Sequence, residues 1–174
     1  MRNDPRIRAA TTDDVHVIIE LVRELAIYEH AEHEALMTAE QLQRALFGAQ
    51  PSVYGLVASA VPGGDVVGFA LYFLNFSTWR GVNGIYLEDL FVLNSQRGTG
   101  LGKALLQTLG EIATERGYAR VEWSVLKWNK PSIEFYESIG AVAMAEWDTM
   151  RLTDEALTSF ARASANQSGD RAIS

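Results

Sequence analysis

The chain has 174 residues, enough for one domain with a sizeable core, and 48% of them are hydrophobic, which excludes general disorder. Acidic residues outnumber basic ones by 22 to 15, and the net charge of −7 argues against nucleic acid as a partner. There is no cysteine, so a disulfide framework, a thiol nucleophile and a thiolate zinc site are excluded. No apolar run could span a bilayer, and no signal-peptide segment follows Met1, so we expect a cytoplasmic protein that does not contact a membrane.

The N-terminal half is predicted to hold two helices and three strands. Thr11 or Thr12 can cap the first helix, and Thr38 with Gln41 forms a capping box for the second. The predicted elements are a strand at 7–9, helices at 15–26 and 38–47, strands at 53–60 and 66–76 with a turn between them at 61–65, and a loop at 75–84.

The C-terminal half is predicted to alternate strands with helices. The elements are a strand at 86–93, a helix from 100 to 116, a strand at 120–126, a helix at 129–139, strands at 141–147 and 149–152, and a helix at 153–163. The helix at 100–116 would join two adjacent parallel strands. We therefore expect an α/β fold, a mixed sheet with helices on both faces, as one domain at 1–163 followed by a flexible tail at 164–174.

A glycine-rich turn between a strand and a helix is the most informative segment. Gly98, Gly100 and Gly102 alternate along it, so the backbone can turn and a ligand can approach closely. A helix that starts here leaves free N–H groups at the positive end of its dipole, which is a site for an anion such as a phosphate. Arg97 and Lys103 add positive charge beside it.

The spacing of these residues excludes two common phosphate loops. Gly98 is too close to Gly102 for a Walker loop, Ala104 follows Lys103, and the dinucleotide spacing also fails. The pattern Arg-x-x-Gly-x-Gly does fit, and it resembles the acetyl-CoA pyrophosphate loop of the GNAT superfamily of N-acetyltransferases. The alternative is an ordinary strand–turn–helix whose glycines serve tight packing.

Other segments extend the resemblance from about Ile7 to about Phe160. VLKWNKPSIEFY at 125–136 with the following Gly-Ala pair looks like the second half of a GNAT core. ELAIYE at 24–29, VGFA at 67–70, YLED at 86–89 and the closing Arg-Leu pair at 151–152 are similar to the spermidine/spermine (diamine) N-acetyltransferases and their thialysine-acetylating relatives. The resemblance implies a mostly antiparallel central sheet with a V-shaped splay between its two central parallel strands.

The resemblance implies acetyl-CoA as co-substrate, bound in the wedge between those strands. The backbone of Leu90, Phe91 and Val92 would pair with the pantetheine amides, and Asn129 and Ser132 would contact the pantetheine arm. For Asn129 a role as helix cap is equally open. The pyrophosphate would lie on Arg97, Gly98, Thr99, Gly100, Leu101, Gly102 and Lys103.

Two residues are candidates for acid–base chemistry. The resemblance makes Tyr136 the general acid that protonates the leaving CoA thiolate, and the alternative is an aromatic packed beside Phe135. Glu88 is the candidate base, acting through a water, because an alkylammonium with a pKa of about 10.4 must lose a proton before it attacks. Glu88 and Asp89 are neighbours on a strand, so only one of them is expected to face the site.

A polyamine or lysine-like substrate calls for negative charge to pair its second ammonium group. We expect substrate contacts at Tyr28, Glu29, Trp79, Glu88 and Asp89, with a cation–π face from Trp79. The resemblance adds substrate contacts on the strand opposite Glu88, at Glu122, Trp123 and Ser124. For the acidic segment around Glu29, the alternative to substrate binding is a solvated loop with no functional role. His30 and His33 could bind a metal, but no third ligand has a recognisable spacing, so we expect no metal.

The leading hypothesis is an acetyl-CoA-dependent N-acetyltransferase that acts on a small di- or polyamine or a lysine analogue, by direct attack in a ternary complex. The alternatives are a GNAT enzyme acting on an amino acid, an aminoglycoside or a protein lysine, and a non-catalytic acyl-CoA-binding module. A nucleotide-binding switch is disfavoured by the failed Walker spacing. Relatives in this branch are commonly homodimers, so a homodimer is expected.

Overall fold

The computed structural model describes residues 4–167, with side chains as far as residue 162. Its contacts divide the chain into two compact units, Met1–Val125 and Leu126–Ser174. The first unit contains all the strands of the described chain, and the second contains two helices joined by an extended segment. The single domain predicted at 1–163 stays a prediction.

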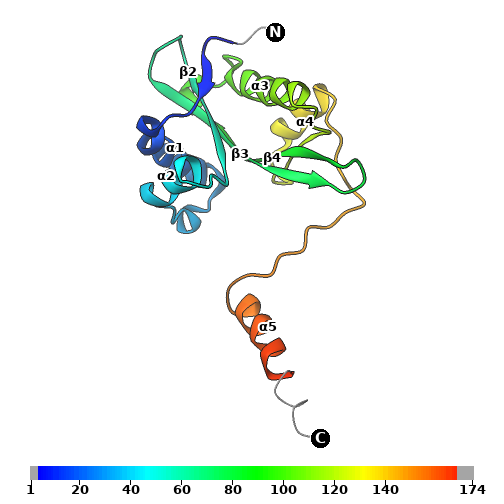
Figure 1. Cartoon of the computed structure of the whole chain (residues 1–174). Helices are drawn as coiled ribbons and strands as arrows, with labels where there is room; N and C mark the ends of the chain where they lie inside the picture. Colours follow the sequence, from blue (N-terminus) through cyan, green and yellow to red (C-terminus); the bar gives the residue numbers. More distant parts are fainter. Residues whose placement is uncertain (1–3, 168–174) are drawn as a thin grey trace, which may run out of the picture. The chain divides into compact units, whose positions relative to one another are not determined.

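The first unit is built on a five-stranded sheet in the order β1-β2-β3-β4-β5 (Figure 1). Neighbouring strands are antiparallel except β4 and β5, which are parallel. The predicted mixed, mostly antiparallel sheet is therefore confirmed. The strands are β1 (Ile7–Ala9), β2 (Tyr54–Ser59), β3 (Val66–Ser77), β4 (Val82–Val92) and β5 (Val121–Trp123).

Helices α1 (Val15–Glu29) and α2 (Ala39–Phe47) cover one face of the sheet (Figure 1). Their apolar stripes supply Ile18, Ile19 and Leu42 to a cluster with the strand residues Phe69 and Phe91. Such a stripe at helical spacing is what buries an amphipathic helix. The predicted capping box of α2 is present, and Thr38 Oγ1 accepts a hydrogen bond from the Gln41 amide at 3.3 Å.

Helix α3 (Leu101–Glu115) covers the opposite face of the sheet, with Leu101, Leu105 and Leu109 almost fully buried (Figure 1). It ends where predicted, because Gly117 has a φ of +66° and the Tyr118 amide donates to the Ala113 carbonyl at 2.8 Å. The prediction of helices on both faces of the sheet is confirmed for this unit.

Two predicted segments of the first unit are shorter in the structure. The loop predicted at 75–84 is a tight hairpin turn, because β3 runs to Ser77 and the Gly81 amide donates to the Ser77 carbonyl at 2.8 Å. The strand predicted at 120–126 is reduced to β5, because only Val121–Trp123 have partners on β4.

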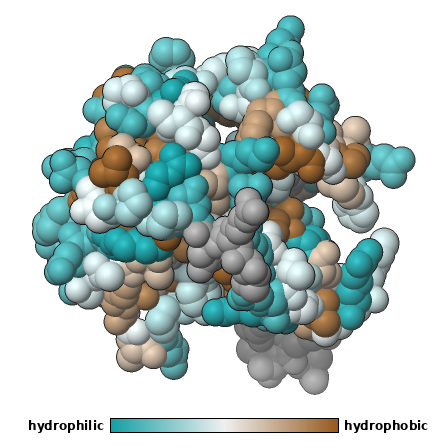
Figure 2. Space-filling model, turned by 90° about the horizontal axis from the view of Figure 1, so that it is seen from above, coloured by the Kyte–Doolittle hydropathy of each residue, from teal (hydrophilic) through white to brown (hydrophobic). Residues whose placement is uncertain are grey.

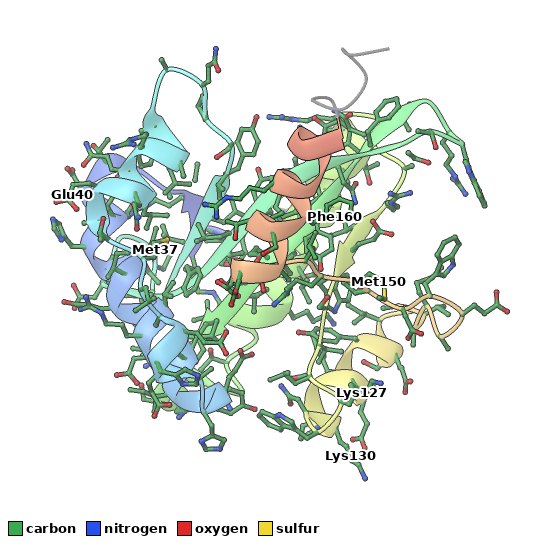
Figure 3. All side chains as sticks on the ribbon, turned by 90° about the horizontal axis from the view of Figure 1, so that it is seen from below. Met37, Glu40, Lys127, Lys130, Met150 and Phe160 are labelled. Atoms are coloured by element: carbon green, nitrogen blue, oxygen red, sulfur yellow. The ribbon has the colours of Figure 1, made fainter. Side chains whose placement is uncertain are left out.

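The second unit holds α4 (Lys130–Ser138) and α5 (Asp154–Gln167). Figure 3 shows Lys127 and Lys130 where the chain enters α4, and Phe160 on α5. Asn129 caps α4 as predicted, with its Oδ1 accepting from the Ser132 amide at 3.4 Å. Helix α5 runs beyond the predicted end at 163, and residues 168–174 of the predicted tail lie outside the described residues.

The strands predicted at 141–147 and 149–152 are wrong for this structure. The segment is extended and exposed, with a turn at 145–146 where the Trp147 amide donates to the Met144 carbonyl at 3.2 Å. A strand needs a neighbour to pair its amides, and no described strand pairs with this segment. Its large apolar side chains are therefore exposed, including Met150, which Figure 3 labels.

Candidate active site

The parallel strands β4 and β5 part at the point where the family resemblance implied a splay. Their pairing covers only Ile85–Leu87 on β4 and Val121–Trp123 on β5, and then stops. Strand β4 continues to Val92, so its residues 88–92 have no strand partner on the β5 side within the described part of the chain. This leaves a row of main-chain amides and carbonyls along one edge of β4, where an extended ligand could add like a strand.

A β-bulge interrupts β4 beside this parting. Leu71 pairs with Asp89 and the next residue, Tyr72, pairs with Leu87, so Glu88 has no partner on β3. Such a bulge bends the strand and changes the direction of the side chains beyond it. Asp89 thereby shares the sheet face of Leu71, the face covered by α1 and α2, while Leu87 faces α3.

Three carboxylates gather where the end of α1 meets this bulge. Burial raises the pKa of Asp89 to about 6, and the negative charges of Glu88 and Glu29 add to the rise. Burial also raises the pKa of Glu29, the last residue of α1. The cluster is therefore a partly buried negative site with one carboxyl that titrates near neutral pH.

The glycine-rich segment forms the start of α3, as the sequence predicted. Gly98 and Gly100 have φ values of +80° and +83°, a left-handed conformation that other residues rarely adopt. Gly100 is the residue that caps α3, so the first amides of the helix have no partner within it. Gly102 leaves only the Leu90 side chain near the position of its missing Cβ, at 3.8 Å. The geometry suits an anion bound close to the backbone.

Arg97 connects this loop to the end of α1. Its guanidinium lies over the ring of Tyr28 at 4.3 Å from the centroid, a cation–π contact. Tyr28 directly precedes Glu29 of the acidic cluster. The structure thus brings residues predicted for the cofactor and for the substrate into direct contact, which sequence spacing did not indicate.

Strand β5 places its predicted residues on a polar network. The Glu122 carboxylate accepts from Arg120 Nε at 2.8 Å and from Asn75 Nδ2 at 2.6 Å. Its charge is therefore already paired within the chain. The Ser124 hydroxyl lies 2.8 Å from that of Tyr86, and Trp123 pairs in register with Leu87 at the parting of the strands.

Trp79 is not brought to this cluster. It lies in the turn between β3 and β4, at the far end of β4 from the bulge, and its side chain is 90% exposed. The strand from Val82 to Glu88 separates the two, roughly 20 Å at the usual rise per residue. The predicted contact of Trp79 with the substrate stays a prediction.

Asn129, Ser132 and Tyr136 belong to the second unit. Tyr136 is half-buried on α4, with its ring centroid 5.6 Å from that of Phe135. The Asn129 side chain caps the helix, which is one of its two predicted roles. The ligand contacts predicted for these three residues stay predictions. Among the side chains described between residues 4 and 162, no group of three or more acidic or histidine residues could hold a metal ion.

A glycine-capped helix, a parted pair of parallel strands and a partly buried carboxylate cluster form an arrangement that suits acyl transfer, the chemistry of the acetyltransferase class. The model of the acetyltransferase (GNAT) family matches residues 18–141, and the chain belongs to this family.

Named relatives and a solved structure support this membership. The chain is 35% identical over 165 residues to the thialysine N-epsilon-acetyltransferase of Mus musculus, covering 90% of this chain and 96% of the relative. It is 32% identical to the L-ornithine N5-acetyltransferase NATA1 of Arabidopsis thaliana, covering 87% of this chain and 86% of the relative. An integron cassette protein from the mobile metagenome of V. cholerae superposes with a TM-score of 0.72 at 29% identity, covering 90% of this chain and 96% of that one.

Proposed function

We propose that the protein transfers the acetyl group of acetyl-CoA to a terminal primary amine of a lysine analogue or a small di- or polyamine. The family generally uses acetyl-CoA as acetyl donor. The observation that carries the proposal is the unpaired edge of β4 at residues 88–92, which leads directly into the glycine-capped start of α3. A thioester with a diphosphate and an amide-bearing arm matches both features.

The cofactor would be held by backbone groups more than by side chains. In this proposal the pantetheine amides pair with Leu90, Phe91 and Val92, and the diphosphate lies on the amides that follow Gly98. Lys103, exposed in the first turn of α3, adds positive charge there. Asn129 and Ser132 are proposed to contact the pantetheine arm.

The acidic cluster is proposed to receive the amine. Glu29, Glu88 and Asp89 form a negative, partly buried site that favours a dication with ammonium groups at both ends. Thialysine and ornithine, the substrates named for the two relatives above, both carry a primary amine at the end of the side chain in addition to the α-ammonium group of an amino acid. A carboxylate that pairs one ammonium group leaves the other free for reaction.

The ammonium nitrogen loses two protons, one before it attacks and one from the tetrahedral intermediate, whereas the departing thiolate gains one, so one proton is released overall. The Glu88–Asp89 pair accepts the proton of the substrate ammonium, Glu88 being the base favoured by the sequence and Asp89 the one with a pKa near 6. The free amine then attacks the thioester carbonyl, and the tetrahedral intermediate collapses as the carbon–sulfur bond breaks. Tyr136 is proposed to donate a proton to the departing thiolate.

An amine panel with acetyl-CoA tests the proposal. Release of the CoA thiol can be followed with a disulfide reagent without background, because the chain contains no cysteine. We expect turnover with thialysine, lysine, ornithine, putrescine or spermidine, and a mass gain of one acetyl group on the distal amine. No turnover with any of them, despite CoA binding, would leave a GNAT enzyme for another amine or a non-catalytic acyl-CoA-binding module.

Two further expectations belong to this proposal. We propose a homodimer, because several large apolar side chains between Ile139 and Phe160 are exposed. The cytoplasmic location expected from the sequence also stays a prediction. No helix among the described residues combines the length and apolar character needed to cross a membrane.

A further inference from the structure

The turn before β1 holds an arginine against the glycine loop. The Ile7 amide donates to the Asp4 carbonyl at 2.9 Å, which closes a turn with Pro5 at its second position. The Arg6 carbonyl accepts from the Ser59 amide of β2 at 2.9 Å. The backbone of Arg6 is therefore attached to the sheet, and its side chain starts from a rigid position.

Three donors of the Arg6 guanidinium have fixed partners. Nε donates to Asp4 Oδ1 at 3.0 Å and Nη2 donates to Asp4 Oδ2 at 2.8 Å, a two-pronged pair that sets the plane of the group. The third donor, Nη1, reaches the main-chain carbonyl of Thr99 at 3.2 Å. Asp4 thus aims Arg6 at the loop between β4 and α3.

The hydrogen bond from Arg6 to the Thr99 carbonyl sets the direction of the Gly100 amide. In a trans peptide the C=O of Thr99 and the N–H of Gly100 point in opposite directions. The Thr99 hydroxyl also donates to the Gln96 carbonyl at 2.7 Å, which ties the same residue to the turn before it. With its carbonyl on Arg6, this peptide can only present the Gly100 N–H away from Arg6.

We propose that Arg6 is a positioning residue for the pyrophosphate loop, and this inference rests on the proposed function of that loop. By holding the Thr99 carbonyl, Arg6 keeps the Gly100 amide aimed at the phosphate and prevents a peptide flip at a residue with a φ of +83°. Asp4 neutralises most of the positive charge of Arg6, so the effect comes from geometry and not from attraction of the anion.

Titration calorimetry with CoA, together with steady-state kinetics, tests the role of Arg6. Arg6→Ala is expected to weaken CoA binding about 3- to 10-fold, the size of one lost hydrogen bond, and to raise the KM for acetyl-CoA equally. The kcat and the KM for the amine should stay unchanged. Arg6→Lys keeps the charge but cannot fork onto Asp4, so we expect a similar loss; full rescue by lysine would overturn the proposal.

Matched variants separate positioning from other effects. Asp4→Asn leaves Arg6 in place and should weaken CoA binding less than Arg6→Ala does. Arg44 is an exposed arginine on α2, and Arg44→Ala should leave CoA binding unchanged. The loss should be equal for CoA and 3′-dephospho-CoA; a loss confined to CoA would mean direct contact with the 3′-phosphate and overturn the proposal. Wild-type protein that binds no CoA would reject the function of the loop, while equal binding by wild type and Arg6→Ala would reject only the role of Arg6.

Discussion

At the scale of single residues, Asp89 shows how the bulge turns a carboxyl into a functional group. In a regular strand, neighbouring side chains alternate, but the extra residue Glu88 sets Asp89 on the sheet face of Leu71, within reach of the charge of Glu29. Burial and the two like charges raise the pKa of Asp89 to about 6. A carboxyl with that pKa is mostly ionised at physiological pH and holds a proton more readily than an ordinary aspartate, which suits proton transfer.

The raised pKa of Asp89 predicts a pH-dependent gain in stability for Asp89→Asn. The ordinary pKa of an aspartate is 3.8 and that of Asp89 in the fold is about 6, so the native state binds the proton more tightly, and stability falls as pH rises through this window. Removing the charge should therefore raise the free energy of unfolding by about 2 kcal/mol more at pH 8 than at pH 4. Urea denaturation at both pH values measures this difference.

The control for this experiment is Asp65→Asn in the exposed turn between β2 and β3, which removes the same charge outside the cluster. An equal pH-dependent gain there would mean that the lower net charge of the variant, and not the site of Asp89, is responsible.

Tyr136→Phe is the second prediction at this scale. If the phenol protonates the leaving thiolate, its loss should lower kcat by about 10²- to 10⁴-fold and leave the affinity for acetyl-CoA intact. Stopped-assay kinetics and calorimetry measure the two quantities. Tyr54→Phe, which removes a hydroxyl from a tyrosine stacked on Tyr72 in the sheet, is the matched control. Unchanged turnover in Tyr136→Phe would remove this residue from the mechanism.

At the scale of elements, the glycine that caps α3 and a glycine inside this helix have opposite effects. Gly100 has a φ of +83° at the cap of the helix, where a Cβ costs about 1 kcal/mol or more. Gly110 lies in the interior of α3, and a Cβ built there meets no atom within 4 Å. One glycine is therefore needed for the shape of the loop, and the other only weakens the helix.

We predict that Gly100→Ala lowers the free energy of unfolding by about 1 kcal/mol and weakens CoA binding, because the cap must leave the left-handed region. Gly110→Ala should raise stability by about 0.5–1 kcal/mol with CoA binding unchanged. Thermal denaturation and calorimetry on both variants check this contrast. Wild-type affinity for CoA in Gly100→Ala would show that the loop does not need its left-handed cap.

The elements that were predictable from the sequence are those specified by local signals. The periodicity of α1 and α3, the capping box at Thr38 and the stop at Gly117 each depend on a few neighbouring residues, and the structure confirms them. The strands predicted at 141–152 failed because a strand depends on a partner that local sequence does not specify. The bulge at Glu88 and the contact of Arg6 with Thr99 are likewise set by distant residues.

The features of the candidate site also divide into those that local sequence predicted and those that depend on distant residues. The glycine loop was predictable because an anion site at a helix start has a short sequence pattern. The contact of Arg97 with Tyr28 was not, since the two residues are far apart in the sequence and meet only because α1 and α3 pack on one sheet. The pairing of Glu122 with Arg120 was missed because a charged residue in a predicted strand does not reveal its partner.

At the scale of the whole molecule, the two units differ in how well they bury apolar residues. Phe69, Ile85 and Leu105 of the first unit are almost fully buried, whereas much of the second unit is exposed. The face seen in Figure 2 mixes hydrophobic and hydrophilic patches. The exposed apolar side chains of the second unit include Ile139, Val142, Met144, Trp147, Met150, Leu152, Leu157 and Phe160. Such a concentration is typical of a surface that is covered by a partner.

The last prediction is therefore a homodimer formed through the second unit. Each copy carries a net charge of −7, so two copies repel one another, and added salt should strengthen the dimer by screening this repulsion. Sedimentation velocity should show a dimer that becomes a monomer in the Val142→Asp and Met150→Asp double variant. Phe76→Asp places one such negative charge, against two in the double variant, on an exposed aromatic of β3 and should remain dimeric. A monomeric wild-type protein at high salt would contradict the prediction, and dissociation of the Phe76→Asp control would move the interface to the hairpin of β3 and β4.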